Sequence, residues 1–115
     1  MNIEHTVEFE KDLKKLSKKY RTLSDDLKNL KKAICSSPEG NGTKHWNLIT
    51  SLGENSVYKV RLASRSVGGD KLRVIYKYNK GQVVLLFIEL YFKGDKVNED
   101  AARIKKYCNN RKNST

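Results

Sequence analysis

Two neighbouring segments of this 115-residue sequence, residues 57–63 and 72–78, alternate between large apolar and mainly cationic side chains. Successive side chains of a β-strand point to opposite faces, so each segment predicts a strand with one apolar and one mainly cationic face. Residues 83–92 are apolar almost throughout, which is typical of a central strand covered on both sides. The turn at Lys80-Gly81 precedes this third strand. Three strands in such close succession favour a small antiparallel sheet.

Apolar residues spaced 4, 3 and 4 positions apart recur in three other parts of the sequence. This spacing places them on one side of a helix, so we expect amphipathic helices over residues 9–20, 24–34 and 97–108. Ser24 is suited to cap the second helix. Because only residues 21–23 separate the first two helices, they must fold back as an antiparallel hairpin.

The remaining segments complete the expected chain order. The first nine residues alternate between apolar and polar side chains, which predicts a short opening strand. Residues 36–42 contain one proline and two glycines and predict an irregular connection. We expect a single α+β domain over residues 1–108, with the helix hairpin packed on one face of the sheet and a terminal helix. A polar tail follows over residues 109–115.

The chain is strongly basic: 24 Lys and Arg stand against 13 Asp and Glu, a formal net charge of +11. Such a charge on a small domain favours a polyanionic or acidic partner, either a nucleic acid or an acidic protein segment. No apolar run reaches the ~18 residues of a membrane span and no secretion signal is recognisable, so we expect a cytoplasmic protein without a membrane partner. Cys35 and Cys108 lack the spacing of a zinc site, so we expect no metal and no cofactor.

Lysines of the predicted helices are explained by solvation, because lysine is the usual solvent-facing residue of an amphipathic helix. The strand cations need more explanation. If the first two of the closely spaced strands pair, Lys59, Arg61, Arg73 and Lys77 share one face, where neighbouring like charges repel. Two interpretations remain open: a polyanion supplies the counter-charge, or the face is open and wet, with long side chains extended into solvent.

Glu89 is the only acidic residue in the three closely spaced strands, in the middle of the most apolar one. A carboxylate at such a position is costly unless it is paired. We expect Arg61 or Arg73 to be its partner, either in a plain salt bridge or with Glu89 as the orienting carboxylate of a site.

Four motifs carry a family resemblance. They are Val57-Tyr58-Lys59-Val60-Arg61-Leu62, Ser64-Arg65-Ser66-Val67-Gly68-Gly69, Leu72-Arg73-Val74-Ile75-Tyr76 and Ile88-Glu89-Leu90-Tyr91-Phe92-Lys93-Gly94-Asp95-Lys96. The pair Leu52-Gly53 precedes the first of them. Together with the order of the predicted elements, these motifs resemble the RelE/ParE superfamily of bacterial type II toxins over nearly the whole chain.

The resemblance implies a RelE-like fold and a toxin that is neutralised by a cognate, acidic antitoxin. For the RelE branch it implies a metal-independent endoribonuclease that cuts mRNA on the ribosome and thereby inhibits translation. The ribose 2′-hydroxyl attacks the adjacent phosphate and leaves a cyclic phosphate. The implied partners are the antitoxin, mRNA and the ribosome, with operator DNA bound only through the antitoxin.

Carried over by position, the resemblance implies four catalytic residues. Lys59 and Arg61 match the paired basic residues of the family's second strand, a candidate general base and a phosphate contact. Arg73 matches the arginine that stabilises charge on the phosphorane, and Lys93 falls where the family has an arginine or histidine that acts as the acid. The candidate RNA-binding residues are Arg65, Lys77, Tyr91, whose ring is suited to stack on a base, and Lys96. Glu89 is the candidate orienting carboxylate.

Two other functions fit the same resemblance. One is a ParE-like toxin that shares the fold, lacks nuclease activity and inhibits DNA gyrase through protein contacts. The other is a catalytically degraded toxin that only binds its antitoxin. We favour the nuclease because Lys59, Arg61 and Arg73 are all present, which the non-nuclease branch does not require. The chain departs from the family at Lys93, a weaker acid than histidine, and in having the closing helix where RelE has a tyrosine-bearing tail.

Overall fold

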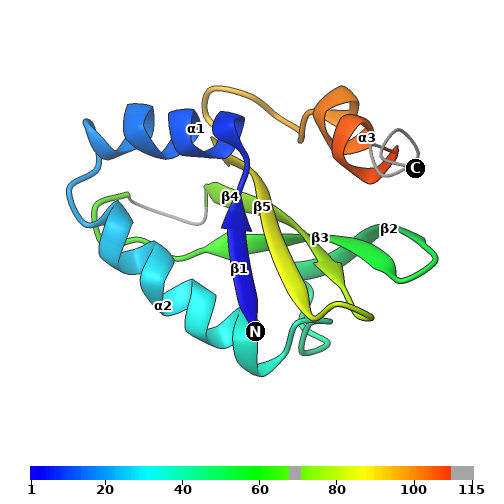
Figure 1. The fold of residues 1–115 in the computed structure, drawn as a ribbon. Coiled ribbons are helices and arrows are strands. Elements are labelled where there is room, and N and C mark those ends of the chain that lie inside the picture. The colour runs from blue at the N-terminus through cyan, green and yellow to red at the C-terminus, as the bar shows by residue number, and fades with distance from the viewer. Residues whose placement is uncertain (68–70, 110–115) are drawn as a thin grey trace.

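The computed structural model describes residues 1–67 and 71–109 and contains a five-stranded sheet with three helices (Figure 1). In chain order the elements are β1 (Asn2–His5), α1 (Val7–Ser17), α2 (Leu23–Ser36), β2 (Trp46–Leu52), β3 (Asn55–Leu62), β4 (Leu72–Asn79), β5 (Val84–Phe92) and α3 (Ala101–Asn109). The predicted α+β class is confirmed, whereas the predicted polar tail lies, from residue 110 onward, outside the described residues.

The strands lie in the order β1-β5-β4-β3-β2. Neighbours from β2 to β5 pair antiparallel, and β1 pairs parallel with β5. The sheet is therefore mixed at one edge rather than purely antiparallel, because the helix hairpin returns the chain to the far side of the sheet before β2 begins (Figure 1).

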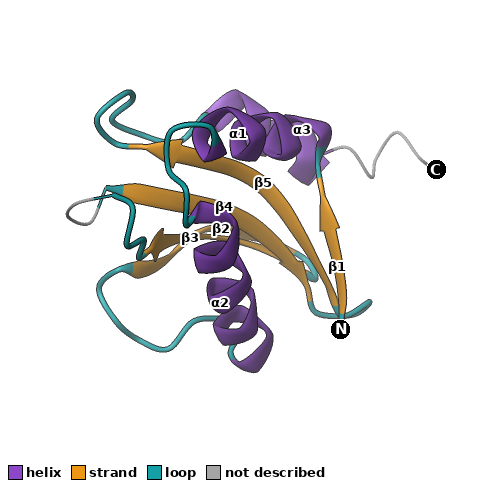
Figure 2. Ribbon diagram, turned by 90° about the vertical axis from the view of Figure 1, so that its left-hand side faces the viewer, coloured by secondary structure: helices purple, strands orange, loops and turns teal. Residues whose placement is uncertain are grey.

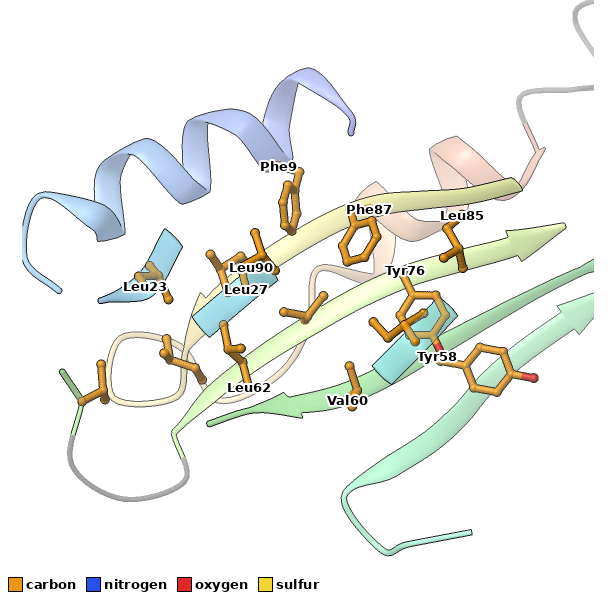
Figure 3. Packing of buried hydrophobic residues seen from close by; sticks show 14 of the residues in the cluster. Phe9, Leu23, Leu27, Tyr58, Val60, Leu62, Tyr76, Leu85, Phe87 and Leu90 are labelled. Atoms are coloured by element: carbon orange, nitrogen blue, oxygen red, sulfur yellow. The ribbon is translucent and has the colours of Figure 1, made fainter. Parts of the chain in front are cut away.

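Different helices cover the two faces of the sheet (Figure 2). α1 and α2 pack on one face and form the larger core cluster with alternate residues of β3, β4 and β5 (Figure 3). Its members include Phe9, Leu23, Leu27, Ile34, Tyr58, Val60, Leu62, Val74, Tyr76 and Phe87. On the opposite face, Ile104 of α3 belongs to a smaller cluster with Val57, Ile75, Ile88 and Tyr91. The predicted packing of the hairpin on one face is confirmed.

The opening strand is shorter than the alternation of the first nine residues predicts, because Thr6 begins a helix. The Thr6 hydroxyl oxygen accepts the Phe9 N–H at 3.0 Å, which is the geometry of a helix N-cap. Thr6 also joins this end of α1 to β5, since its N–H donates to the Phe87 carbonyl at 3.0 Å. As a result α1 begins at Val7, and Phe9 is fully buried in the core instead of extending a strand.

The start of α2 also differs from the prediction. Thr22 is the N-cap, and Ser24 lies inside the first turn. The Thr22 N–H donates to Ser66 Oγ at 2.7 Å, and the Thr22 hydroxyl donates to Asp26 at 2.7 Å. Because Ser66 lies in the loop between β3 and β4, a contact distant in sequence holds the beginning of this helix.

β2 is a strand that the sequence analysis missed. It forms a hairpin with β3, and the turn passes through Gly53, whose φ of 59° lies in the left-handed region. The glycines that predict an irregular connection precede this strand. Trp46 anchors it, because its Nε1 donates to the Tyr76 hydroxyl at 2.8 Å, which in turn donates to the Pro38 carbonyl at 2.7 Å.

α3 begins at Ala101 rather than at Val97, which is 73% exposed and lies in the preceding loop. The carboxylate of Asp100 accepts the Arg103 N–H at 3.0 Å and so satisfies an amide of the first turn. Within the described part of the chain, no helix combines the length and apolar composition needed to cross a membrane.

Candidate functional site

The strand cations that were predicted to share one face do share it. Tyr58, Val60 and Leu62 of β3 point into the core beneath α1 and α2. Because side chains alternate along a strand, Lys59 and Arg61 lie on the opposite face. The register of β4 against β3 places Arg73 and Lys77 on the same side. We call this surface the cationic face and define it by Lys59, Arg61, Arg73 and Lys77.

At the centre of the cationic face, three side chains form a row across three strands. Arg61 of β3 is the direct partner of Arg73 of β4, and Arg73 is the direct partner of Tyr91 of β5. Directly opposite side chains in such a sheet begin about 5 Å apart. We call Arg61, Arg73 and Tyr91 the arginine row. Both arginines are half-buried, and Arg73 Nη1 donates to the carbonyl of Leu72 at 3.0 Å.

Lys59 lies beside the arginine row and is joined to a residue that the sequence analysis missed. Its ammonium Nζ donates to Oε1 of Glu99 at 3.0 Å. Burial acts to raise the pKa of Glu99, but hydrogen bonds from its own backbone and from Lys59 and Tyr91 outweigh burial and hold that pKa below its usual value. Glu99 lies in the loop before α3, where no periodicity indicates which way a side chain points.

Tyr91 is 5% exposed and lies near Lys96 and Glu99 of this loop. Burial, followed by the negative charges of Glu99 and Glu89, raises the pKa of Tyr91 to about 12. The ammonium of Lys96 lies 5.5 Å from the centroid of its ring. In this arrangement the Tyr91 ring is covered rather than open to an RNA base.

The expected partner of Glu89 was wrong. Glu89 is 1% exposed, and its Oε1 accepts the Asp100 N–H at 2.8 Å while its Oε2 contacts the Lys96 ammonium. Both contacts come from the loop after β5, which folds back over the strand, instead of from an arginine. Glu89 therefore anchors the loop that carries Glu99, because a carboxyl group at this depth is costly to bury without polar contacts.

Lys77 also engages the C-terminal segment. Its ammonium donates to the carbonyl of Tyr107 at 3.0 Å, near the negative end of the α3 dipole. On its other side α3 is held to α1, since Arg103 pairs with Asp12 at 2.7 Å and Lys106 with Glu8 at 2.9 Å. α3 thus covers the part of the cationic face around Lys77.

The remaining two predicted site residues, Arg65 and Lys93, are exposed at the end of the sheet where β3 and β5 end and β4 begins. The Lys93 N–H donates to the Lys71 carbonyl at 2.7 Å, so the β4–β5 ladder continues one pair beyond Leu72 and Phe92. Lys93 is two positions after Tyr91, which corresponds to about 6.6 Å along a strand.

Two cavities border this region. One of about 210 Å³ is lined by Glu89, Tyr91 and Lys96 together with residues of α1, and a groove of about 290 Å³ runs between β2 and α3 with Glu99 at its wall. Neither is lined by Arg61 or Arg73. Among the described residues, no group of three or more His, Cys, Asp or Glu is placed to hold a metal ion.

The chemistry of the cationic face is that of anion binding. Guanidinium groups are permanently charged and form paired hydrogen bonds to phosphate oxygens, so two of them side by side suit a phosphodiester. A carboxylate, an ammonium and a phenol adjoin them at Glu99, Lys59 and Tyr91. The cationic face therefore brings arginines together with a carboxylate, an ammonium and a phenol.

Comparison of the sequence with protein-family models and with curated proteins gave no match. Comparison of the structure with solved structures gave a match to a chain of the crystal structure of the archaeal RelE-RelB complex from Pyrococcus horikoshii OT3. The two chains are 19% identical and superpose with a TM-score of 0.60 over 81% of this chain and 94% of that chain. The likeness covers most of both chains, and the chain therefore has the RelE fold, as the resemblance predicts.

Proposed function

We propose that the protein is the toxin of a type II toxin–antitoxin system and cleaves mRNA on the ribosome as a metal-independent endoribonuclease. The observation that carries this proposal is the arginine row: Arg61 and Arg73 are direct cross-strand partners on one face of the sheet and are both partly exposed. The RelE fold supports it, since the solved neighbour is described as RelE in complex with RelB.

The residues on the cationic face and at the adjoining end of the sheet take complementary roles in this proposal. Arg61 and Arg73 bind the scissile phosphate and stabilise the charge that accumulates on it as the 2′-hydroxyl attacks. Lys93 donates a proton to the leaving 5′-oxygen. Arg65, which is exposed on the β3–β4 loop, binds the RNA backbone next to the scissile phosphate. The products are a 2′,3′-cyclic phosphate and a 5′-hydroxyl end.

A cognate antitoxin is the second proposed partner. The net charge of +11 favours an acidic antitoxin, because charges of opposite sign accelerate association and exclude partners of like charge. An antitoxin that covers the cationic face also blocks RNA. Operator DNA is reached only through the antitoxin.

The decisive experiment is expression of the native chain and of Arg73→Ala in cells, followed by primer extension on a reporter mRNA. Loss of one donor to the developing charge is expected to slow cleavage by about 10²-fold or more. Lys80→Ala is the matched control, because it removes one exposed cation from the β4–β5 turn at the opposite end of β4. This control is expected to arrest growth and cut mRNA like the native chain.

Arrested growth with intact mRNA would refute the nuclease, and DNA double-strand breaks in the same cells would identify the gyrase inhibitor instead. Ribosome binding at several salt concentrations gives an independent test. Several phosphate contacts make the logarithm of the binding constant fall steeply with the logarithm of salt concentration, whereas binding through protein contacts gives a shallow slope.

A further inference from the structure

The proposed reaction needs a group that removes the proton from the attacking 2′-hydroxyl, and two carboxylates adjoin the cationic face. Glu89 is 1% exposed; its Oε1 accepts the Asp100 N–H, and its Oε2 lies against the Lys96 ammonium. The side chain of Glu99 is 22% exposed, so that a substrate can reach it. Of these two, Glu99 is the carboxylate that is open to RNA.

Two contacts hold Glu99 beside the arginine row, and Tyr91 lies near it. Lys59 donates to its Oε1 at 3.0 Å from β3, and Tyr91, a member of the arginine row, is close enough from β5 for the two groups to shift each other's pKa. The next residue, Asp100, is tied to Glu89 through its N–H at 2.8 Å. The carboxylate is thus positioned by the sheet, although it belongs to a loop.

We propose that Glu99 accepts the proton of the attacking 2′-hydroxyl and is the general base of this site. The proposal rests on the ribonuclease function proposed above and assigns a step in it. Lys59, which donates a hydrogen bond to Glu99, then acts as a cation that orients the carboxylate and faces the phosphate. Tyr91 orients the same carboxylate from the other strand.

The protonation state of Glu99 suits this role. Its lowered pKa keeps the carboxylate ionised at neutral pH, so the base is present in its active form before RNA binds. A bound phosphodiester brings a negative charge close to the carboxylate, which raises its pKa and therefore its basicity. The approach of the substrate thus strengthens the base.

The bonds and protons of the step balance with groups on this face. The 2′-oxygen forms a bond to phosphorus as its proton passes to a Glu99 carboxylate oxygen. The bond from phosphorus to the 5′-oxygen breaks, and the 5′-oxygen takes a proton from the Lys93 ammonium. Along the strands, Lys93 lies on one side of the arginine row, and Lys59 with its partner Glu99 lies on the other side. The acid and the base therefore flank the phosphate that Arg61 and Arg73 bind.

The test compares Glu99→Gln with the native chain in single-turnover cleavage of mRNA on ribosomes, with ribosome binding measured in parallel. Glutamine keeps the size and the hydrogen-bonding oxygen of the side chain but has no basicity. We expect cleavage to fall by about 100-fold or more while ribosome binding is unchanged. Asp95→Asn is the matched control, because it neutralises an exposed carboxylate of the same loop, and we expect it to cleave like the native chain.

The pH profile separates a base from a structural residue. The native rate is expected to rise with pH as Glu99 ionises and then to level off, and Glu99→Gln is expected to lose this acidic limb. The titratable groups nearest to Glu99 are Lys59 of β3 and Tyr91 of β5. Glu89 and Arg73 lie near Tyr91, and Lys105 of α3 lines the neighbouring groove. Glu99→Asp retains a carboxylate and is expected to retain the acidic limb at a reduced rate.

Each outcome decides the assignment. Undiminished or faster cleavage by Glu99→Gln would overturn it and identify Glu99 as a residue that competes with RNA for Lys59. Equal loss in Glu99→Gln and Glu99→Asp, with an unchanged pH profile, would also overturn it. Absence of cleavage by the native chain would instead refute the proposed function, so the two failures are distinguishable.

Discussion

Arg61 and Arg73 are direct cross-strand partners, so two positively charged side chains face each other at the centre of the sheet. Side chains at directly opposite positions begin about 5 Å apart, so the two guanidinium groups are placed to bind one phosphodiester together. We expect Arg61→Thr, which places a residue of high strand propensity at this position, to leave the fold intact. Circular dichroism checks that the variant is folded.

The same substitution is expected to weaken ribosome binding, because it removes one of the two guanidinium groups of the arginine row. One fewer phosphate contact reduces the slope of log binding constant against log salt by about one. Lys80→Thr in the β4–β5 turn serves as the control and is expected to leave the slope unchanged. An unchanged slope in Arg61→Thr would contradict the prediction.

Val83 is expected to be replaceable with a gain in stability. Its φ of 58° lies in the left-handed region, which β-branched residues rarely adopt, and its side chain is 43% exposed. Glycine removes strain of about 1–2 kcal/mol and costs about 0.5–1 kcal/mol in chain entropy, so Val83→Gly is expected to raise the free energy of unfolding by up to about 1 kcal/mol. Thermal melts of the native chain and the variant measure this gain. Val97→Gly, at an exposed valine without a positive φ, is the control and is expected to give no gain in the same melts.

Asp26 is expected to be required for a stable start of α2. It is buried, and Oδ2 accepts the Thr22 hydroxyl at 2.7 Å. Burial acts to raise its pKa, but hydrogen bonds from Ser64 and Thr22 outweigh burial and lower it. Asp26→Ala leaves these donors without their acceptor, and we expect it to destabilise the fold by about 1–3 kcal/mol. Asp25→Ala, an exposed neighbour on the same helix, should change the urea midpoint far less.

The contact between α1 and α3 is expected to weaken in acid. Hydrogen bonds from Tyr107 and Lys106 lower the pKa of Glu8 from 4.5 to about 2. Because the folded protein binds the proton of Glu8 less readily than the unfolded chain, this contact contributes fully above the unfolded value and is lost as the pH falls through the folded value. Amide hydrogen exchange of α3 should therefore accelerate, relative to α1, between about pH 4.5 and pH 2.

Glu8→Gln isolates this effect from the other carboxylates of the protein. The variant lacks the titrating group, so the difference in α3 exchange between it and the native chain is expected to shrink as the pH falls. A difference that stays constant with pH would show that Glu8 does not hold α3.

Sequence patterns predicted the faces of β3 and β4 and the cationic character of one of them. Alternation is a local property of an extended chain, so the assignment of Lys59, Arg61, Arg73 and Lys77 to a single face follows once the two strands pair. Prediction failed for β2, because glycine and proline nearby dominated the interpretation. It also failed for the starts of α1 and α2, where Thr6 and Thr22 are held by contacts with residues far along the chain.

Glu89 and Glu99 illustrate why the site was only partly predictable. The sequence indicates that a carboxylate buried in an apolar strand needs a partner, and the structure supplies Lys96 and the Asp100 amide instead of an arginine. The pairing of Glu99 with Lys59 had no sequence signal, since a loop residue has no fixed direction until its chain has folded back over the sheet.

The amino-acid sequence by itself determined the elements with regular periodicity, the net charge and the strand faces that carry Lys59, Arg61, Arg73 and Lys77, because each depends on side-chain identity and on repeats of 2.0 or 3.6 residues. Only the tertiary structure decided which residues meet across loops: the covering of Lys77 by α3, the burial of Tyr91 and the position of Glu99 at the cationic face. Those contacts depend on where the chain after β5 returns over the sheet, which local periodicity does not encode.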